Sequence, residues 1–380
     1  MALDVALSLS TVASRREDPA YLCEQLITCI GNKRALLVPI EAALDMVSRR
    51  LGDRKLRMLD AFAGSGVVSR LFKSWAAHLV SNDIEEYAIA IARSFLQNQS
   101  GIDLGRLHDI AAELNARVDS PVHEPGFIEA LYAPADESAI GKSDRVFYTR
   151  VNARRLDNYR RMLDGLDDAD RILLLGPLLS EASIHANTAG VFKGFYKDRT
   201  TGVGRFGGTN AEALHRIRGE ITLAPPVLSR FECEVEVTQC DANEVVRQAR
   251  DLDVAYFDPP YNQHPYGSNY FMLNLIAKYE RPREVSPVSG IPPDWRRSDY
   301  NVRARAHAAL ADLFEHVDAR FLLVSFNDEG FVSPVQMREL LARFGRVEVI
   351  ETSYNTFRGC RNLRKRSLHV TEQLFLVERD

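Results

Sequence analysis

The sequence predicts an α/β protein built on a parallel, doubly wound sheet that a second, mainly helical unit interrupts. Strand and helix patterns alternate from residue 56 to residue 97, and they alternate again from residue 234 onward. Between these stretches the alternation stops, and helical patterns, polar turns and glycine-rich loops continue to about residue 230. Alternation indicates a parallel sheet because each helix carries the chain back to the edge where the next strand begins.

Composition and charge bound the kinds of protein that this chain can be. Its 380 residues suffice for two or three domains, or for one large domain with an insertion. A formal net charge of -4 would argue against a nucleic-acid partner if charge were spread evenly, but basic residues occur in clusters. The five cysteines form no C-x-x-C pair, so we expect neither a disulfide framework nor a metal site.

The apolar stretches are too short for a membrane protein. The longest one, residues 172–179, falls far below the ~20 residues that span a bilayer. The N-terminus lacks a basic flank followed by a signal-type apolar core. We therefore expect an unprocessed cytoplasmic chain without membrane contact.

The first alternating stretch predicts three helices and two strands. Apolar residues at three- and four-residue steps predict an amphipathic helix over residues 33–47. Strands are predicted at 56–62 and 77–81, followed by helices over 67–75 and 85–97 respectively.

The second alternating stretch predicts five more strands, which brings the total to about seven. They are expected at residues 234–239, 253–257, 321–326, 347–351 and 372–377.

Three parts follow from this pattern. Residues 1–20 are unpatterned and are expected to form an N-terminal arm. Residues 105–231 are expected to form the inserted domain, and segments 21–104 and 232–380 to build the catalytic domain together.

A glycine-rich turn between the first predicted strand and its helix indicates a nucleotide site. Gly64 and Gly66 let the backbone approach a ligand that faces the helix N-terminus. Asp83, at the end of the second strand, is placed to accept from ribose hydroxyls. These features serve a dinucleotide oxidoreductase as well as a methyltransferase.

Two details favour methyl transfer. Arg70 stands where a third small residue would pack over a pyrophosphate. Asp60 would repel a pyrophosphate but attract the ammonium of a methionine moiety.

Two further polar positions have both a binding and a structural interpretation. Lys33, after Gly31 and Asn32, could reach a ligand carboxylate beside a helix N-terminus, or it could be a solvated lysine after a turn. Asp241 could accept from the adenine amine of a cofactor, or it could cap the helix predicted over 243–250.

The tetrad Asp258-Pro259-Pro260-Tyr261 directly follows the apolar run 253–257. Proline fixes φ and has no N–H, so the turn offers carbonyl acceptors at fixed positions. Asp258 and a proline carbonyl can accept both hydrogens of an exocyclic amine, while the ring of Tyr261 stacks on the heterocycle. An ordinary Asp-Pro turn after a strand is the alternative.

The order of these elements resembles that of the alpha-class, Dam-like DNA adenine N6-methyltransferases. That order is Gly31-Asn32-Lys33, Asp60 to Gly66, Asp83, an insertion, Asp241, and Asp258 to Tyr261. Segments 262–270, 325–330 and 354–358 are similar to the site-specific modification enzymes of type II restriction systems.

The resemblance implies a Rossmann-like, seven-stranded methyltransferase sheet whose last strand, near 372–377, is antiparallel. It implies an inserted target-recognition domain of helices and loops, S-adenosylmethionine as methyl donor, and a flipped-out adenine in duplex DNA as target. We expect a monomeric enzyme that is nucleoid-associated through DNA. Whether a cognate restriction endonuclease exists stays open, and RNA adenine N6-methylation and dinucleotide-dependent oxidoreduction are the alternatives.

Carried over by position, the resemblance assigns roles to individual residues. The catalytic set is the tetrad Asp258, Pro259, Pro260 and Tyr261. The cofactor-binding set is Asn32, Lys33, Asp60, Phe62, Ala63, Gly64, Gly66, Asp83, Asp241 and Asp258.

Two basic clusters are candidates for DNA contacts. The loop 191–209 interleaves basic, aromatic and glycine residues, as contact with phosphates and bases would need. A second cluster lies between the last two strands. Both could instead be solvated surface loops. The expected DNA-binding residues are Lys193, Lys197, Arg199, Arg205, Arg358 and Arg361.

Overall fold

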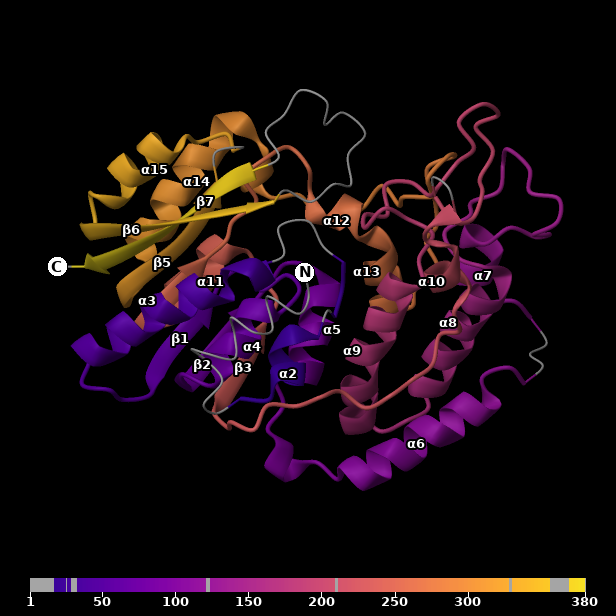
Figure 1. The fold of residues 1–380 in the computed structure, drawn as a ribbon, viewed down its shortest axis with the longest axis horizontal. Coiled ribbons are helices and arrows are strands. Elements are labelled where there is room, and N and C mark those ends of the chain that lie inside the picture. The colour runs from indigo at the N-terminus through magenta and orange to yellow at the C-terminus, as the bar shows by residue number, and fades with distance from the viewer. Residues whose placement is uncertain are drawn as a thin grey trace.

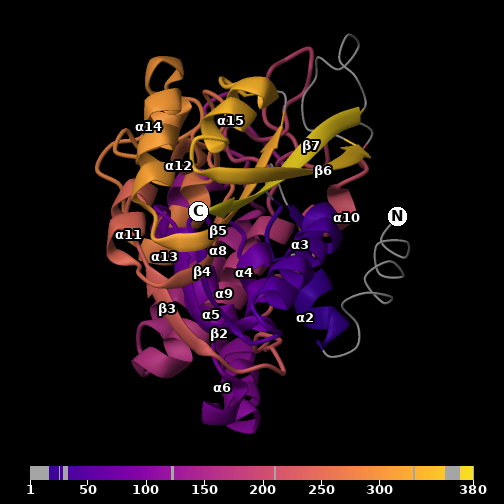
Figure 2. The same ribbon diagram turned by 90° about the vertical axis from the view of Figure 1, so that its left-hand side faces the viewer.

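The computed structural model divides into a sheet-containing half and a helical half that lie side by side in Figure 1. In Figure 2 the sheet-containing half faces the viewer. It describes residues 17–24, 26–28, 33–120, 124–208, 211–327, 330–355 and 369–379.

The sheet has seven strands in the order β3-β2-β1-β4-β5-β7-β6. β7 is antiparallel to both of its neighbours, and the other pairs are parallel. The predicted strand number and the antiparallel last strand are therefore confirmed. The bounds are β1 Leu56–Asp60, β2 Ala76–Asn82, β3 Glu234–Thr238, β4 Leu252–Phe257, β5 Ala319–Asn327, β6 Gly345–Asn355 and β7 His369–Arg379.

Helices cover both faces of the sheet. Successive side chains of its central strands are therefore buried on opposite sides. Tyr256 of β4 packs in a core with η1, α3 and α4, whereas the next residue, Phe257, packs in a core with α11, α14 and α15. The bounds are η1 Lys33–Leu36, α3 Leu37–Arg50, α4 Val67–Lys73, α11 Ala242–Gln248, α14 Arg303–His316 and α15 Pro334–Leu341. The helices predicted at 33–47, 67–75 and 243–250 are confirmed, with ends shifted by a few residues.

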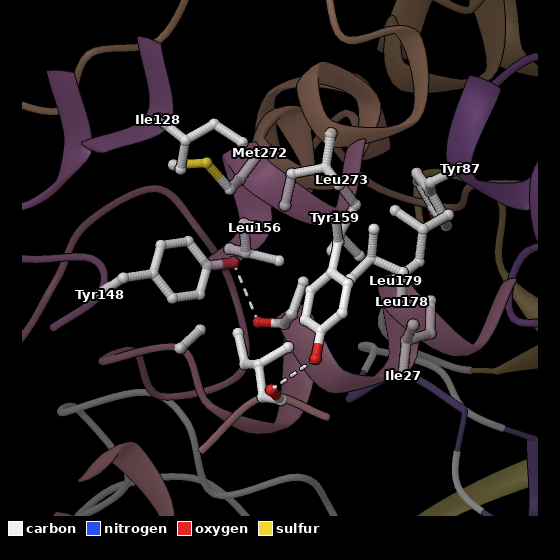
Figure 3. Close-up of a cluster of buried hydrophobic side chains, with 14 of the residues drawn as sticks. Ile27, Tyr87, Ile128, Tyr148, Leu156, Tyr159, Leu178, Leu179, Met272 and Leu273 are labelled. Carbon is white, nitrogen blue, oxygen red and sulfur yellow. Dashed lines mark hydrogen bonds between the residues drawn. The ribbon is translucent and has the colours of Figure 1, made fainter. Parts of the chain in front are cut away.

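The helical half has a core of its own, into which α5 (Glu86–Phe95) and α13 (Phe271–Lys278) also pack. In Figure 3, Tyr87 of α5 and Met272 of α13 lie around one cluster with Leu156 and Leu178. Residues 270–279, which follow the Asp258 tetrad in sequence, are thus built into the helical half. The other helices are α6 Leu104–Arg117, α7 Phe127–Tyr132, α8 Arg150–Leu163, α9 Asp168–Ile184 and α10 Leu214–Arg218.

Gly176 and Pro177 of α9 explain how the two halves approach each other. A Cβ on Gly176 would lie 2.5 Å from Cβ of Ser94 on α5, so only glycine fits this crossing. Pro177 has no N–H for the carbonyl of Leu173, and the Ser94 hydroxyl donates to that carbonyl at 2.8 Å instead.

Glu17 and Asp18, assigned to the N-terminal arm, contact residues 229–230 of the main body. Glu17 is buried and accepts hydrogen bonds from the Ser229 hydroxyl and the Arg230 N–H. Asp18 caps α2 (Pro19–Cys23). Arg70, which we contrasted with a small residue in a dinucleotide fold, is buried and donates to the carbonyls of α2 and its C-cap. Among the described helices, none is long and apolar enough to cross a membrane.

Candidate active site

A pocket opens where the parallel strands β1, β2 and β4 end. The space between its walls is about 900 Å³, including the part open to solvent. Eight predicted site residues line it: Lys33, Phe62, Ala63, Gly64, Asp83, Asp241, Asp258 and Pro260. The carboxyl edge of a doubly wound sheet is where such folds bind ligands.

The glycine-rich turn after β1 forms one wall of the pocket. Gly64 and Gly66 have φ of 53° and 74°, in the left-handed region that favours glycine. The Gly64 N–H donates to Asp83 Oδ2 at 2.7 Å, and the Glu85 N–H donates to Asp83 Oδ1 at 2.9 Å. Burial raises the pKa of Asp83 despite these hydrogen bonds. Both carboxylate oxygens of Asp83 are thus fixed at the pocket wall.

Asp60 lies behind this wall and is fully buried. Its Oδ2 accepts from the Ser69 hydroxyl at 2.7 Å, while Oδ1 has no hydrogen-bond donor among the described residues. Burial raises the pKa of Asp60 to about 7. Neither Asp60 nor Gly66 is in the pocket lining, so a ligand contact with Asp60 would need Oδ1 to become accessible.

Asp241 combines the two roles between which the sequence left a choice. It is the N-cap of α11 and accepts from the Asn243 N–H at 2.9 Å. It also lines the pocket beside Cys240 and Ala242. The capping role is therefore confirmed, and contact with a cofactor stays a prediction.

Asp258 stands at the end of β4, in a cluster of buried charges. Lys33 Nζ lies 3.0 Å from Asp258 Oδ1 and 2.9 Å from Glu372 Oε1. Burial raises the pKa of Asp258 to about 6, although the ammonium of Lys33 opposes this. Burial alone would lower the pKa of Lys33, but the carboxylates of Asp258 and Glu372 raise it well above its ordinary value.

The four residues of the tetrad differ in whether they line the pocket. Pro260 faces the pocket, whereas Pro259 and Tyr261 are not in its lining. The rings of Tyr261 and Phe326 pack edge to face at a centroid distance of 6.2 Å. The backbone carbonyl of Tyr261 accepts from the Phe331 N–H at 2.9 Å. Stacking of Tyr261 on a base stays a prediction.

Sequence reasoning missed the far wall of the pocket. Tyr266, Arg296, Arg297, Tyr300 and Asn301 line it. Tyr300 packs edge to face on Phe62 at 5.3 Å, and Asn301 donates to the carbonyl after the tetrad at 2.7 Å. Residues 296–301 carry no glycine turn or strand signal that would have placed them there.

The candidate DNA loop is a short hairpin closed by an antiparallel bridge between Lys197 and Gly204. Phe192 and Phe195 are buried in the helical core, so they are not exposed for base contact; this corrects our interpretation of the aromatic residues in this loop. Lys197 lies 4.9 Å above the Phe195 ring, and Arg205 donates to the Gly208 carbonyl at 2.7 Å.

Three predicted residues lie outside the described residues: Asn32, Arg358 and Arg361. In the described part of the chain, His, Cys, Asp and Glu side chains form no group of three or more that could hold a metal ion.

The fold is a doubly wound α/β fold with a pocket at the carboxyl edge of its sheet, and comparison with known proteins identifies the family. Residues 30–317 match the model of the D12 class N6 adenine-specific DNA methyltransferases. The chain belongs to this family. Methyl transfer to adenine in DNA, rather than hydride transfer, is therefore its chemistry.

Similar proteins cover nearly the whole chain. The type II methyltransferase M.NlaIII of Neisseria lactamica is 28% identical over 91% of this chain and 99% of its own length. M.CviAII of Paramecium bursaria Chlorella virus 1 is 27% identical over 82% of this chain and 88% of its own length. The modification methylase StsI of Streptococcus sanguinis is 25% identical over 92% of this chain but 51% of its own length.

Proposed function

We propose that the chain transfers the methyl group of S-adenosylmethionine to N6 of an adenine flipped out of a specific duplex DNA sequence. The observation that carries the proposal is that Asp83 and Gly64, suited to the donor, and Asp258, suited to the target amine, line one pocket. A donor and an acceptor must meet at near-contact distance for direct transfer.

The residues of the pocket suit S-adenosylmethionine, whose sulfonium supplies the methyl group. Asp83 is held for ribose hydroxyls, and Phe62 with Tyr300 offers an aromatic surface to the adenine ring. Asp60 Oδ1, a buried acceptor without a donor among the described residues, suits the ammonium of the methionine part. Lys33 lines the pocket and is the candidate for the donor carboxylate through its remaining N–H.

Asp258 and the tetrad carbonyls orient the target amine. As hydrogen-bond acceptors they hold the two N6 hydrogens and leave the nitrogen lone pair directed at the donor. N6 becomes cationic as the methyl group arrives and loses its proton afterwards, so an ordinary carboxylate suffices as acceptor. Flipping the adenine costs a few kcal/mol, which stacking on Tyr261 would partly offset.

The hairpin at 191–208 is the proposed DNA contact nearest the tetrad. Its Phe192 N–H donates to the Asn269 carbonyl at 2.7 Å, which joins the hairpin to the chain just after the tetrad. The pKa of His264 is lowered by burial and by the charge of Lys193. Lys193 is exposed on this hairpin and is our candidate for a phosphate contact.

The relatives are named type II methyltransferases and modification methylases, which supports a modification enzyme of a restriction system. A cognate endonuclease is the partner that such a system implies. We further propose that the enzyme acts as a cytoplasmic monomer bound to chromosomal DNA.

Methyl transfer from tritiated S-adenosylmethionine tests the proposal. Genomic DNA lacking the modification should gain label, recovered after digestion as N6-methyl-2′-deoxyadenosine, and Asp258→Ala should abolish it. Label in another nucleoside, or full activity of Asp258→Ala, would refute the assignment. Competition between duplex DNA and structured RNA separates the two nucleic acids as substrates.

A further inference from the structure

We infer that Arg297 and Arg303 bind the DNA phosphates that flank the flipped-out adenine. Both arginines border the tetrad, and sequence reasoning identified neither of them as a DNA contact. The inference rests on the proposed function, because these phosphates lie beside the tetrad only when the adenine enters the pocket.

Arg297 belongs to the far wall of the pocket, which residues 296–301 contribute. This wall is tied to the tetrad, because the Asn301 side chain donates to the carbonyl of Asn262, the residue after Tyr261, at 2.7 Å. Arg297 lines the pocket and is also exposed, so it lies where the pocket meets solvent.

Arg303, the first residue of α14, is connected to the tetrad through Phe331. Its guanidinium carbon lies 4.8 Å from the centroid of the Phe331 ring. The Phe331 N–H donates to the Tyr261 carbonyl at 2.9 Å. An exposed cation is thus separated by one residue from the tyrosine that we propose to stack on the target base.

Aromatic rings, and not carboxylates, hold these two guanidinium groups. The guanidinium carbon of Arg297 lies 4.2 Å from the centroid of the Trp295 ring. Within the described ranges of the chain, neither Arg297 nor Arg303 has an ion-pair partner. Two nearby arginines are paired instead, Arg296 with Glu86 at 3.2 Å and Arg305 with Asp299 at 2.9 Å. The charges of Arg297 and Arg303 are therefore available to an anion.

Stacking prepares an arginine for a phosphate. The five N–H donors of a guanidinium lie in its plane, so a ring against its face leaves them free. Because the ring already restricts the side chain, less conformational freedom is lost when the anion binds. A phosphate can then accept two parallel N–H groups from one arginine.

Base flipping explains why such cations are needed beside the tetrad. A flipped adenine remains attached to its sugar, so the two flanking phosphates are drawn toward the mouth of the pocket. Phosphate contacts of this kind fix the position of the nucleotide without reading its sequence. They also offset part of the cost of unstacking the base.

Arg297→Ala and Arg303→Ala test the inference on a duplex that carries the methylated site, mapped first in genomic DNA. Fluorescence anisotropy with bound S-adenosylhomocysteine measures affinity without turnover. Each variant should bind about tenfold more weakly, and its slope of log K against log salt should be smaller by about 0.9. On a duplex with neutral methylphosphonates on both sides of the target adenine, neither substitution should weaken binding further.

Arg320→Ala is the matched control. Arg320 is also exposed and stacked on a ring, with its guanidinium carbon 5.8 Å from the Phe321 centroid. It lies near the start of β5, however, at the edge of the sheet opposite the pocket, so its loss should change neither value. Calorimetry should show unchanged donor binding in all three variants, which also confirms that they are folded.

Three results would overturn the inference. They are wild-type DNA affinity and salt slope in Arg297→Ala and Arg303→Ala, an undiminished effect of these substitutions on the methylphosphonate duplex, and weaker donor binding in place of weaker DNA binding. If the wild-type protein methylates no adenine in genomic DNA, the mapping step fails, and it is the proposed function that is refuted.

Discussion

The carboxylates of this pocket illustrate how position alone gives one residue type different tasks. Asp83 accepts two backbone N–H groups at the pocket wall. Asp258 faces an ammonium and a second carboxylate. Asp60 is buried behind the wall, and one of its oxygens has no hydrogen-bond donor in the part of the chain that the structure describes. The sequence predicted these aspartates because each lies at or just after the end of a strand. It also predicted Lys33 as a cofactor ligand, but it gave no sign that Lys33 pairs with Asp258 and Glu372.

The raised pKa of Asp258 predicts a pH dependence of catalysis. With a pKa of about 6, Asp258 is mostly an ionised acceptor at pH 7 and becomes protonated as the pH falls below 6. Protonation turns one carboxylate oxygen from a hydrogen-bond acceptor into a donor, so kcat should fall about tenfold per pH unit below that value. Single-turnover rates from pH 5 to 8 measure this limb, and a flat profile would contradict it.

Asp258→Asn separates charge from shape. The amide occupies the same space but carries no charge, so we expect kcat to drop by about 10²-fold or more and the acid limb to disappear. Donor binding, measured in parallel, serves as the control for folding.

At the scale of elements, α9 joins the two halves at a crossing without room for a side chain. Gly176 packs against Ser94 and Phe95 of α5. The Ser94 hydroxyl donates to the Leu173 carbonyl, which Pro177 leaves without its helical N–H donor. The sequence showed Gly176 and Pro177 only as interruptions of an apolar run. The structural role of these two residues depends on which helix packs against them.

Gly176→Ala should therefore destabilise the fold. The added Cβ would lie 2.5 Å from Ser94 Cβ, and overpacking of this kind costs about 1–3 kcal/mol. Urea unfolding measures the loss. Gly101→Ala, with no atom within 4 Å of the new Cβ, is the control and should leave stability nearly unchanged.

The hairpin at 191–208 should contribute charge rather than aromatic stacking to DNA binding. Lys193→Ala and Lys197→Ala should each weaken binding and reduce the slope of log K against log salt by about 0.9. Fluorescence anisotropy over a salt series gives both values. Lys55→Ala, just before β1 at the opposite edge of the sheet, should change neither; equal effects of all three would refute a specific role for the hairpin.

At the scale of the whole molecule, the pocket is lined by segments that lie far apart in the sequence. Its lining comes from residues 33–87 and from residues 240–301, so a bound ligand holds both together. S-adenosylmethionine at 100 times its Kd should stabilise the protein by about 2.7 kcal/mol.

Thermal unfolding with and without donor checks this expectation. Asp83→Ala should lose most of the shift, because it removes the ribose acceptor and frees the Gly64 N–H. Glu113→Ala, exposed on α6, should keep it. An Asp83 variant with the full shift would place the donor elsewhere.

The sequence by itself determined the alternating elements, the seven strands, the glycine turn, and the aspartates and tetrad that follow strands. These are local signals, because periodicity, turn chemistry and strand ends are read within about 20 residues. Tertiary structure alone decided which distant groups meet. It brought Glu372 to Lys33, residues 296–301 to the pocket, and Phe192 with Phe195 into a core. Such contacts depend on strand order and helix packing, which no local pattern encodes.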